Sequence, residues 1–163
     1  MTLIADPLEF AQRGERLQGS VELKALSRLA DELVDREGSV KFEVFGVVVG
    51  DDHFLEVSIE AQPRVQCQRC LQSLALDLAL QVRFLLVPPG EVIPDDELEE
   101  DSFDAIAAER NLDVLALIED ELLLALPISP RHEVCDTPQP RERDDSASPF
   151  AALASLRGAG KKS

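Results

Sequence analysis

Tryptophan and tyrosine are absent from this chain of 163 residues, histidine occurs only twice and cysteine three times. Apolar residues still make up 45% of the sequence, and most of them are leucine, valine and alanine. An apolar share of this size excludes a chain that is disordered throughout. The length allows one domain with a core of its own, together with tails.

Basic residues are also scarce, because 16 lysines and arginines face 32 aspartates and glutamates, for a formal charge of −16. Binding to phosphate uses lysines and arginines that displace counterions, so this charge excludes a surface that binds nucleic acid throughout. Two interpretations stay open. The acidity matches a partner that is itself basic, or it only keeps the protein in solution.

Long hydrophobic runs are missing as well. The opening residues MTLIADPLEF lack the basic and apolar regions of a secretory signal peptide. The longest apolar-rich stretch, residues 112–126, is interrupted by acids and is too short to span a bilayer. We therefore expect a cytoplasmic protein that does not enter a membrane and whose thiols stay reduced, without a structural disulfide.

The sequence also lacks the motifs of common enzyme classes. It has no serine–histidine–aspartate or cysteine–histidine–aspartate order, no glycine-rich phosphate loop and no H-E-x-x-H. His53 lies in or beside a turn, and the G-D-D at residues 50–52 is best explained as turn chemistry. We expect a protein that is not an enzyme and has no small-molecule substrate.

Hydrophobic spacing predicts an α+β fold, an antiparallel β-sheet of at least three strands packed against helices. Residues 1–37 are expected to be partly helical, since leucines recur at helical spacing before Gly38, at positions Leu26, Leu29 and Leu33. Residues 40–61 predict a β-hairpin, with apolar residues alternating on both sides of the G-D-D turn. Strict alternation from Leu74 to Leu86 predicts one long, half-buried strand whose leucines face a helix.

The segment from Asn111 to Pro127 predicts that covering helix, with Asn111 as the N-cap and Pro127 as the stop. Glu119 projects into its apolar stripe, which consists of Leu112, Leu115, Ile118, Leu122 and Leu126. A carboxylate on the buried side of a helix needs a partner. We expect this partner to be Arg69, because a guanidinium binds a carboxylate through two parallel hydrogen bonds. A solvated Arg69 is the alternative.

Two polar segments flank this helix. Eight acids and no base lie between Glu91 and Asp104, which predicts a solvated acidic loop. The chain also becomes loop-like after Pro130. We expect residues 1–135 to form a single α+β domain and residues 136–163 to form a linker, partly disordered, with a short amphipathic basic tail.

The tail combines apolar and basic residues at helical spacing, namely Phe150, Leu153, Leu156, Arg157, Lys161 and Lys162. Such an element after a linker is either a docking peptide or a helix that folds back onto its own domain.

The pair Cys67 and Cys70, in VQCQRCLQS, lies between two predicted strands. A redox pair is disfavoured, because thioredoxin-type cysteines lie at a helix N-terminus within a βαβ unit. A structural zinc site is possible, since His132 and Cys135 add an H-x-x-C and complete a set of three thiols and one imidazole. Reduced thiols packed at a hairpin tip remain the other interpretation.

Three fragments, VQCQRCLQS, EDELLLALPISPRH and SPFAALASLR, resemble in that order the bacterial YceD family of large ribosomal RNA subunit accumulation proteins. Cys67, Arg69 and Cys70 match its C-x-R-C, and the helix motif is matched by Glu119, Leu126 and Pro127. The resemblance implies a role in synthesis, processing or stability of 23S ribosomal RNA, without a known catalytic activity.

These observations favour a non-enzymatic factor of large-subunit assembly that acts through basic ribosomal proteins or other assembly factors, and contacts ribosomal RNA directly or through them. The alternative is a direct RNA-binding module with a structural zinc at the hairpin tip. Its contacts would come from the terminal lysines and from Arg64, Arg69 and Arg83.

Overall fold

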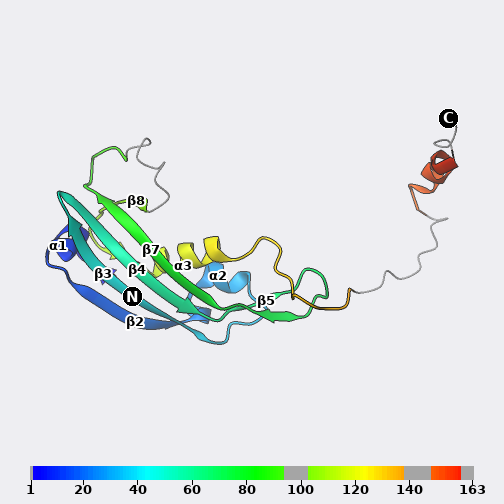
Figure 1. Ribbon diagram of the computed structural model, residues 1–163, viewed down its shortest axis with the longest axis horizontal. Coiled ribbons are helices and arrows are strands. Elements are labelled where there is room, and N and C mark those ends of the chain that lie inside the picture. The colour runs from blue at the N-terminus through cyan, green and yellow to red at the C-terminus, as the bar shows by residue number, and fades with distance from the viewer. Residues whose placement is uncertain (1, 94–102, 138–147, 159–163) are drawn as a thin grey trace.

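A curved five-stranded sheet forms the centre of the molecule (Figure 1), in a computed structural model that describes residues 2–93, 103–137 and 148–158. The strand order is β2-β3-β4-β7-β8. The first four strands are antiparallel neighbours and β8 runs parallel to β7. Their bounds are β2 Arg16–Glu22, β3 Ser39–Val49, β4 Asp52–Ala61, β7 Leu78–Val87 and β8 Asp104–Ala107. The predicted α+β class is confirmed.

Two small ribbons and a few short helices complete the fold. The ribbons pair β1 (Leu3–Ile4) with β9 (Leu112–Asp113), and β5 (Arg64–Gln66) with β6 (Ser73–Ala75). The helices are α1 Pro7–Gln12, η1 Leu23–Ala25, α2 Ser27–Asp31, α3 Val114–Ala125 and η4 Ala151–Gly158. None of the helices in the described ranges is long and apolar enough to cross a membrane.

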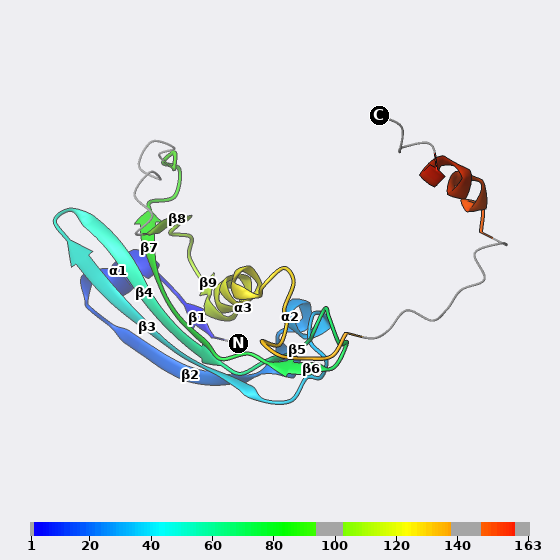
Figure 2. The ribbon, with the colours of Figure 1, turned by 45° about the vertical axis from the view of Figure 1, so that its right-hand side comes forward.

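The core lies between one face of the sheet and the helices. Figure 2 shows α2 and α3 on the concave side of the curved sheet. Helix α1 packs so closely on β3 that a Cβ at Gly46 would lie 2.6 Å from the carbonyl oxygen of Phe10. The alternating apolar side chains of the strands point to this side and meet those of the helices, including Leu29, Val40, Val44, Leu55, Val57, Ile59, Phe84, Ile118 and Leu122.

The predicted hairpin is confirmed. The predicted long strand is not continuous, but its apolar side chains do face the core. β3 and β4 join through a two-residue turn in which Gly50 has φ +63°. The expected single strand is divided, because Leu76 donates its N–H to the carbonyl of Pro63 and so stays with the β5–β6 ribbon. Beyond this break the apolar side chains of β7 pack into the core as predicted, at Leu78, Leu80, Val82, Phe84 and Leu86.

The N-terminal region contains a strand that the sequence pattern did not indicate. β2 is an edge strand with only Leu17 and Val21 half-buried, and Gly19 in its middle makes room for the ring of Phe42. The helix expected before Gly38 is limited to α2. β8 was also not predicted, while the middle of the expected acidic loop, residues 94–102, lies outside the described residues.

Helix α3 is confirmed, but its N-cap is Asp113 rather than Asn111. The Asp113 carboxylate accepts from the backbone N–H groups of Leu115 and Ala116 at 3.0 and 3.3 Å. Asn111 has φ +59° and lies in the turn before β9. A left-handed residue cannot hold the extended backbone that an N-cap needs, so the cap moves two residues forward.

Candidate metal centre

The first half of the centre is the turn of the β5–β6 ribbon. Cys67 donates its N–H to the carbonyl of Gln72, and Leu71 donates to the carbonyl of Cys67, each at 2.9 Å. Leu71 adopts φ +64°, which closes the turn. This turn brings Cys67 and Cys70 onto one side of the ribbon. The Cys67 side chain is fully buried and that of Cys70 is half-buried.

The second half is the segment that follows α3. Gln68 donates its N–H to the carbonyl of Pro130 at 2.8 Å, which fixes this segment against the ribbon turn. The backbone N–H of His132 points at the Sγ of Cys67, 3.5 Å away. Residues more than sixty positions apart in the chain are therefore brought together by backbone contacts.

The four side chains that the sequence singled out as metal ligands converge. One ligand atom from each of Cys67, Cys70, His132 and Cys135 lies within 4.8 Å of every other. The Sγ atoms of Cys67 and Cys135 are 3.8 Å apart, and the Sγ of Cys70 lies 3.3 Å from the Nδ1 of His132. In tetrahedral zinc sites, bonds of about 2.3 Å to sulfur and about 2.0 Å to nitrogen give ligand separations of about 3.5 to 3.8 Å. The cluster can therefore hold a metal ion such as zinc.

The imidazole of His132 is oriented by a partner outside the cluster. Its Nε2 lies 3.1 Å from the carbonyl oxygen of Ser73. A carbonyl only accepts, so Nε2 carries the proton and Nδ1 presents its lone pair toward the thiols. Histidines that bind metals are held by this kind of hydrogen bond on the other ring nitrogen.

The backbone of the turn favours a thiolate at Cys67. Burial raises the pKa of this thiol, but hydrogen bonds from the backbone N–H groups of Cys70, His132 and Arg69 outweigh burial and lower the pKa to about 5. Burial and the neighbouring thiols of Cys67 and Cys70 raise the pKa of Cys135. A bound cation would offset the repulsion between these thiolates. All three cysteines are free of disulfides.

Glu119 has a partner, as expected, but the partner is Arg28 and not Arg69. The buried carboxylate accepts from the backbone N–H groups of Arg28 and Leu29 at 2.8 and 3.1 Å, and from the guanidinium Nε of Arg28 at 3.0 Å. It acts as a cap for α2, whose own first residues supply no side-chain cap. The sequence pattern gave one signal that was missed, an arginine beside Leu29 in a predicted helix.

Two of the three arginines proposed for RNA contacts are paired with acids of the same chain. Arg64 lies 2.9 Å from Asp35 and 3.2 Å from Glu37. Arg83 lies over the ring of Phe54, 4.3 Å from its centre, and its Nε is 3.6 Å from the Glu56 carboxylate. Arg69, half-buried between the two cysteines, forms no ion pair within the part of the chain that the structure describes.

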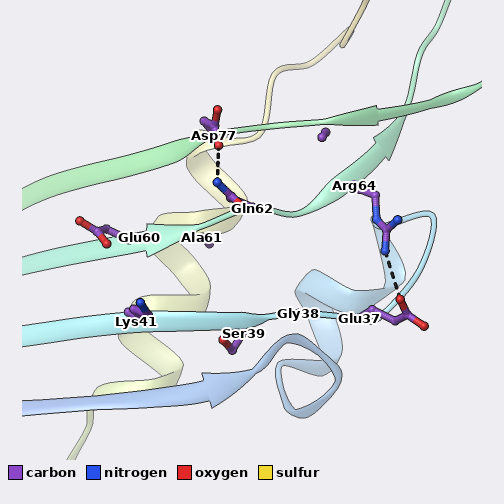
Figure 3. Close-up of a pocket in the computed structure, with 10 residues that line it drawn as sticks. Glu37, Gly38, Ser39, Lys41, Glu60, Ala61, Gln62, Arg64 and Asp77 are labelled. Carbon is purple, nitrogen blue, oxygen red and sulfur yellow. Dashed lines mark hydrogen bonds and ion pairs between the residues drawn. The ribbon is translucent and has the colours of Figure 1, made fainter.

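A hollow of about 800 Å³ lies on the outer face of the sheet, near the β5–β6 ribbon. Figure 3 shows its lining, with Arg64 bonded to Glu37 and Gln62 bonded to Asp77 at 2.8 Å. Lys41 and Glu60 lie on neighbouring strands in its floor. These contacts hold strand ends together across an open, mixed-charge surface, which distinguishes the hollow from the convergent metal cluster.

Comparison with known proteins agrees with the sequence resemblance. The family model described as large ribosomal RNA subunit accumulation protein YceD matches residues 55–157. Over nearly its full length the chain is also similar to the large ribosomal RNA subunit accumulation protein YceD of Haemophilus influenzae, with 28% identity and 96% of each chain covered. No solved structure matches the chain significantly. The matched region contains the ribbon turn, α3 and the ligands after it, and the chain belongs to the YceD family of large ribosomal RNA subunit accumulation proteins.

Proposed function

We propose that the protein is a non-enzymatic factor of ribosome biogenesis that supports the synthesis, processing or stability of 23S ribosomal RNA and the assembly of the large subunit. Membership of the YceD family is the observation that carries this proposal. The family name describes accumulation of an RNA and not a chemical reaction.

We propose further that the protein acts through basic ribosomal proteins or assembly factors. Its formal charge of −16 complements positively charged partners. The pairing of Arg64 and Arg83 with acids of the same chain supports this choice, since a paired guanidinium is less available to phosphate.

The metal centre has a structural role in this proposal. A zinc ion held by Cys67, Cys70, His132 and Cys135 would fix the segment after α3 to the ribbon turn. Four protein ligands leave no open position, which is typical of structural and not catalytic zinc.

The test is deletion of the gene in the organism that encodes it, with 16S ribosomal RNA as internal reference. We expect a lower ratio of 23S to 16S ribosomal RNA, restored by the wild-type gene and not by a Cys67→Ser, Cys70→Ser variant. An unchanged ratio after deletion would overturn the proposal. Pull-down of the tagged protein with and without nuclease then identifies the partner, and basic proteins should remain bound after nuclease treatment.

Direct RNA binding is the second candidate, favoured by one observation. Arg69 lies between two metal ligands and has no acidic partner in the described chain. A salt titration with 23S fragments separates the candidates, because direct binding through several phosphates weakens steeply as salt rises. We expect little binding to naked RNA at physiological salt.

A further inference from the structure

Helix α3 leaves apolar side chains uncovered on the side away from the sheet. Ile118 and Leu122 are fully buried, yet Leu124 is 79% exposed and Ile128, just beyond the helix, is fully exposed. We call Leu124 and Ile128 the outer stripe. Figure 2 shows no described helix or strand over this side of α3.

A second uncovered apolar surface lies near the C-terminus. Phe150, Leu153 and Leu156, the C-terminal row, are 71%, 54% and 65% exposed. Phe150 lies directly before η4, a 3₁₀ helix, and Leu153 and Leu156 lie within it. The three residues per turn of such a helix place every third side chain in one line. Leu153 donates its N–H to the carbonyl of Phe150 at 2.9 Å, and Phe150 donates to the Ser148 hydroxyl at 3.2 Å. These local hydrogen bonds order the row, and its three apolar side chains are largely exposed.

The charges around the two surfaces are opposite. Residues 148–163 carry three bases and no acidic side chain. The outer stripe is flanked by Asp120 and Glu121. Burial, together with the charges of Asp104 and Asp120, raises the pKa of Glu121. Asp120 is bonded to Arg28, whereas Glu121 has no basic partner within the described chain. A base beside Glu121 would relieve this repulsion.

A short linker joins the C-terminal row to the body that carries α3. Ten residues, 138–147, separate the described end of the body from Ser148. Ten residues extend to at most about 35 Å, about twice the 18 Å length of a 12-residue helix such as α3. A tether of this length gives the segment a high effective concentration near α3.

From these observations we propose that the C-terminal row docks on the outer stripe of the same chain. The two apolar surfaces cover each other, and the basic composition of residues 148–163 complements the acidic side chains beside the outer stripe. The arrangement covers Leu124, the apolar side chain of α3 that the core leaves exposed. The family match, which runs to Arg157, includes both surfaces.

Site-specific photo-crosslinking in the full-length protein tests this docking. The crosslinking amino acid p-benzoyl-phenylalanine replaces Phe150, and cross-linked peptides are identified by mass spectrometry in an equal mixture of unlabelled and ¹⁵N-labelled chains. We expect cross-links to residues 117–128, within chains of one isotope. The matched control carries the crosslinker at Ala152, which points away from the row and should give at least fivefold fewer of these products.

Two further variants test whether the outer stripe is the docking surface. The Leu124→Ser, Ile128→Ser variant should reduce the cross-links at least fivefold without unfolding the chain, because both side chains are exposed. Val34→Ser, another exposed apolar position, should leave them unchanged. Cross-links mainly between labelled and unlabelled chains would overturn docking within one chain and indicate a second copy. Absence of cross-links to residues 117–128 would overturn the proposal and leave the row free for another protein.

Discussion

Glu119 joins two helices that lie far apart in the sequence. Its carboxylate accepts from two backbone N–H groups at the start of α2 and from the Arg28 side chain. Hydrogen bonds to Asp120 and Glu119 also raise the pKa of Arg28. The two backbone contacts satisfy donors at the start of α2 that would otherwise lose their partner inside the protein.

Replacing Glu119 by alanine is expected to destabilise the fold by about 2–4 kcal/mol, because buried donors are left without acceptors. Urea unfolding followed by far-ultraviolet circular dichroism measures this, since the chain has no tryptophan. The combined loss of Arg28→Ala and Glu119→Ala should be smaller than the sum of the two. Arg69→Ala is the control. The loss of unfolding free energy in the double variant Arg69→Ala, Glu119→Ala should equal the sum of the two single losses within about 0.5 kcal/mol. Coupling to Arg69 instead would contradict the assigned pair.

Glu121 predicts a pH dependence. Its raised pKa means that the folded state binds the proton more tightly than the unfolded state, so ionisation of this group costs stability. Glu121→Gln should therefore stabilise the protein at neutral pH. The gain should vanish below the ordinary glutamate pKa of 4.5, where the carboxyl is protonated in both states. Urea midpoints at pH 7 and pH 4 measure it. A gain of equal size at both pH values would exclude this cause.

Sequence patterns identified side-chain chemistry better than side-chain partners. Cys67, Cys70, His132 and Cys135 were identified as candidate ligands, because few residue types bind metal and the chain has few of them. The pattern also showed that Glu119 needs a partner. It did not identify Arg28, since 91 residues separate the two and only the packing of α2 on α3 brings them together.

Among the elements, α3 depends on its cap. Asp113→Ala should cost about 1 kcal/mol in unfolding free energy, as the first N–H groups of α3 lose their acceptor. Asn111→Gly should be close to neutral, because φ +59° suits glycine. Urea unfolding of both variants decides between the two positions. A larger loss of unfolding free energy in Asn111→Gly would indicate that Asn111 is the N-cap, as the sequence suggested.

Elements with a strong two-residue period were predicted and weakly patterned ones were not. β3, β4 and β7 each direct alternate apolar side chains into the core, and that alternation is visible in the sequence. β2 has glycine and polar residues because it lies at the sheet edge, and β8 has only four residues. Their strand conformation is determined by pairing with a neighbour, which no local pattern records.

At the scale of the whole molecule, the candidate metal centre lies at the end of the continuous described body of the chain. We propose that the domain ends at residue 135, the last ligand. Removal of zinc with a chelator should increase hydrogen exchange at residues 64–75 and 127–137, while β3 and β4 stay protected, since the core is built without these segments. Elemental analysis should find one zinc per chain in wild type and none in Cys67→Ser, Cys70→Ser. Unchanged exchange in metal-free protein would argue for packed thiols alone.

The β1–β9 ribbon imposes an order on the folding of a newly made chain. Leu3 and Ile4 pair with residues that follow about 110 positions later, at Asp113 and Leu112. At a synthesis rate of about 5–20 residues per second, the first strand waits on the order of 5–20 s for its partner. Helix α3 and the last two metal ligands come later still. Most of the β-hairpins can form during translation, but closure of the core is a late event that follows emergence of the C-terminal third of the chain.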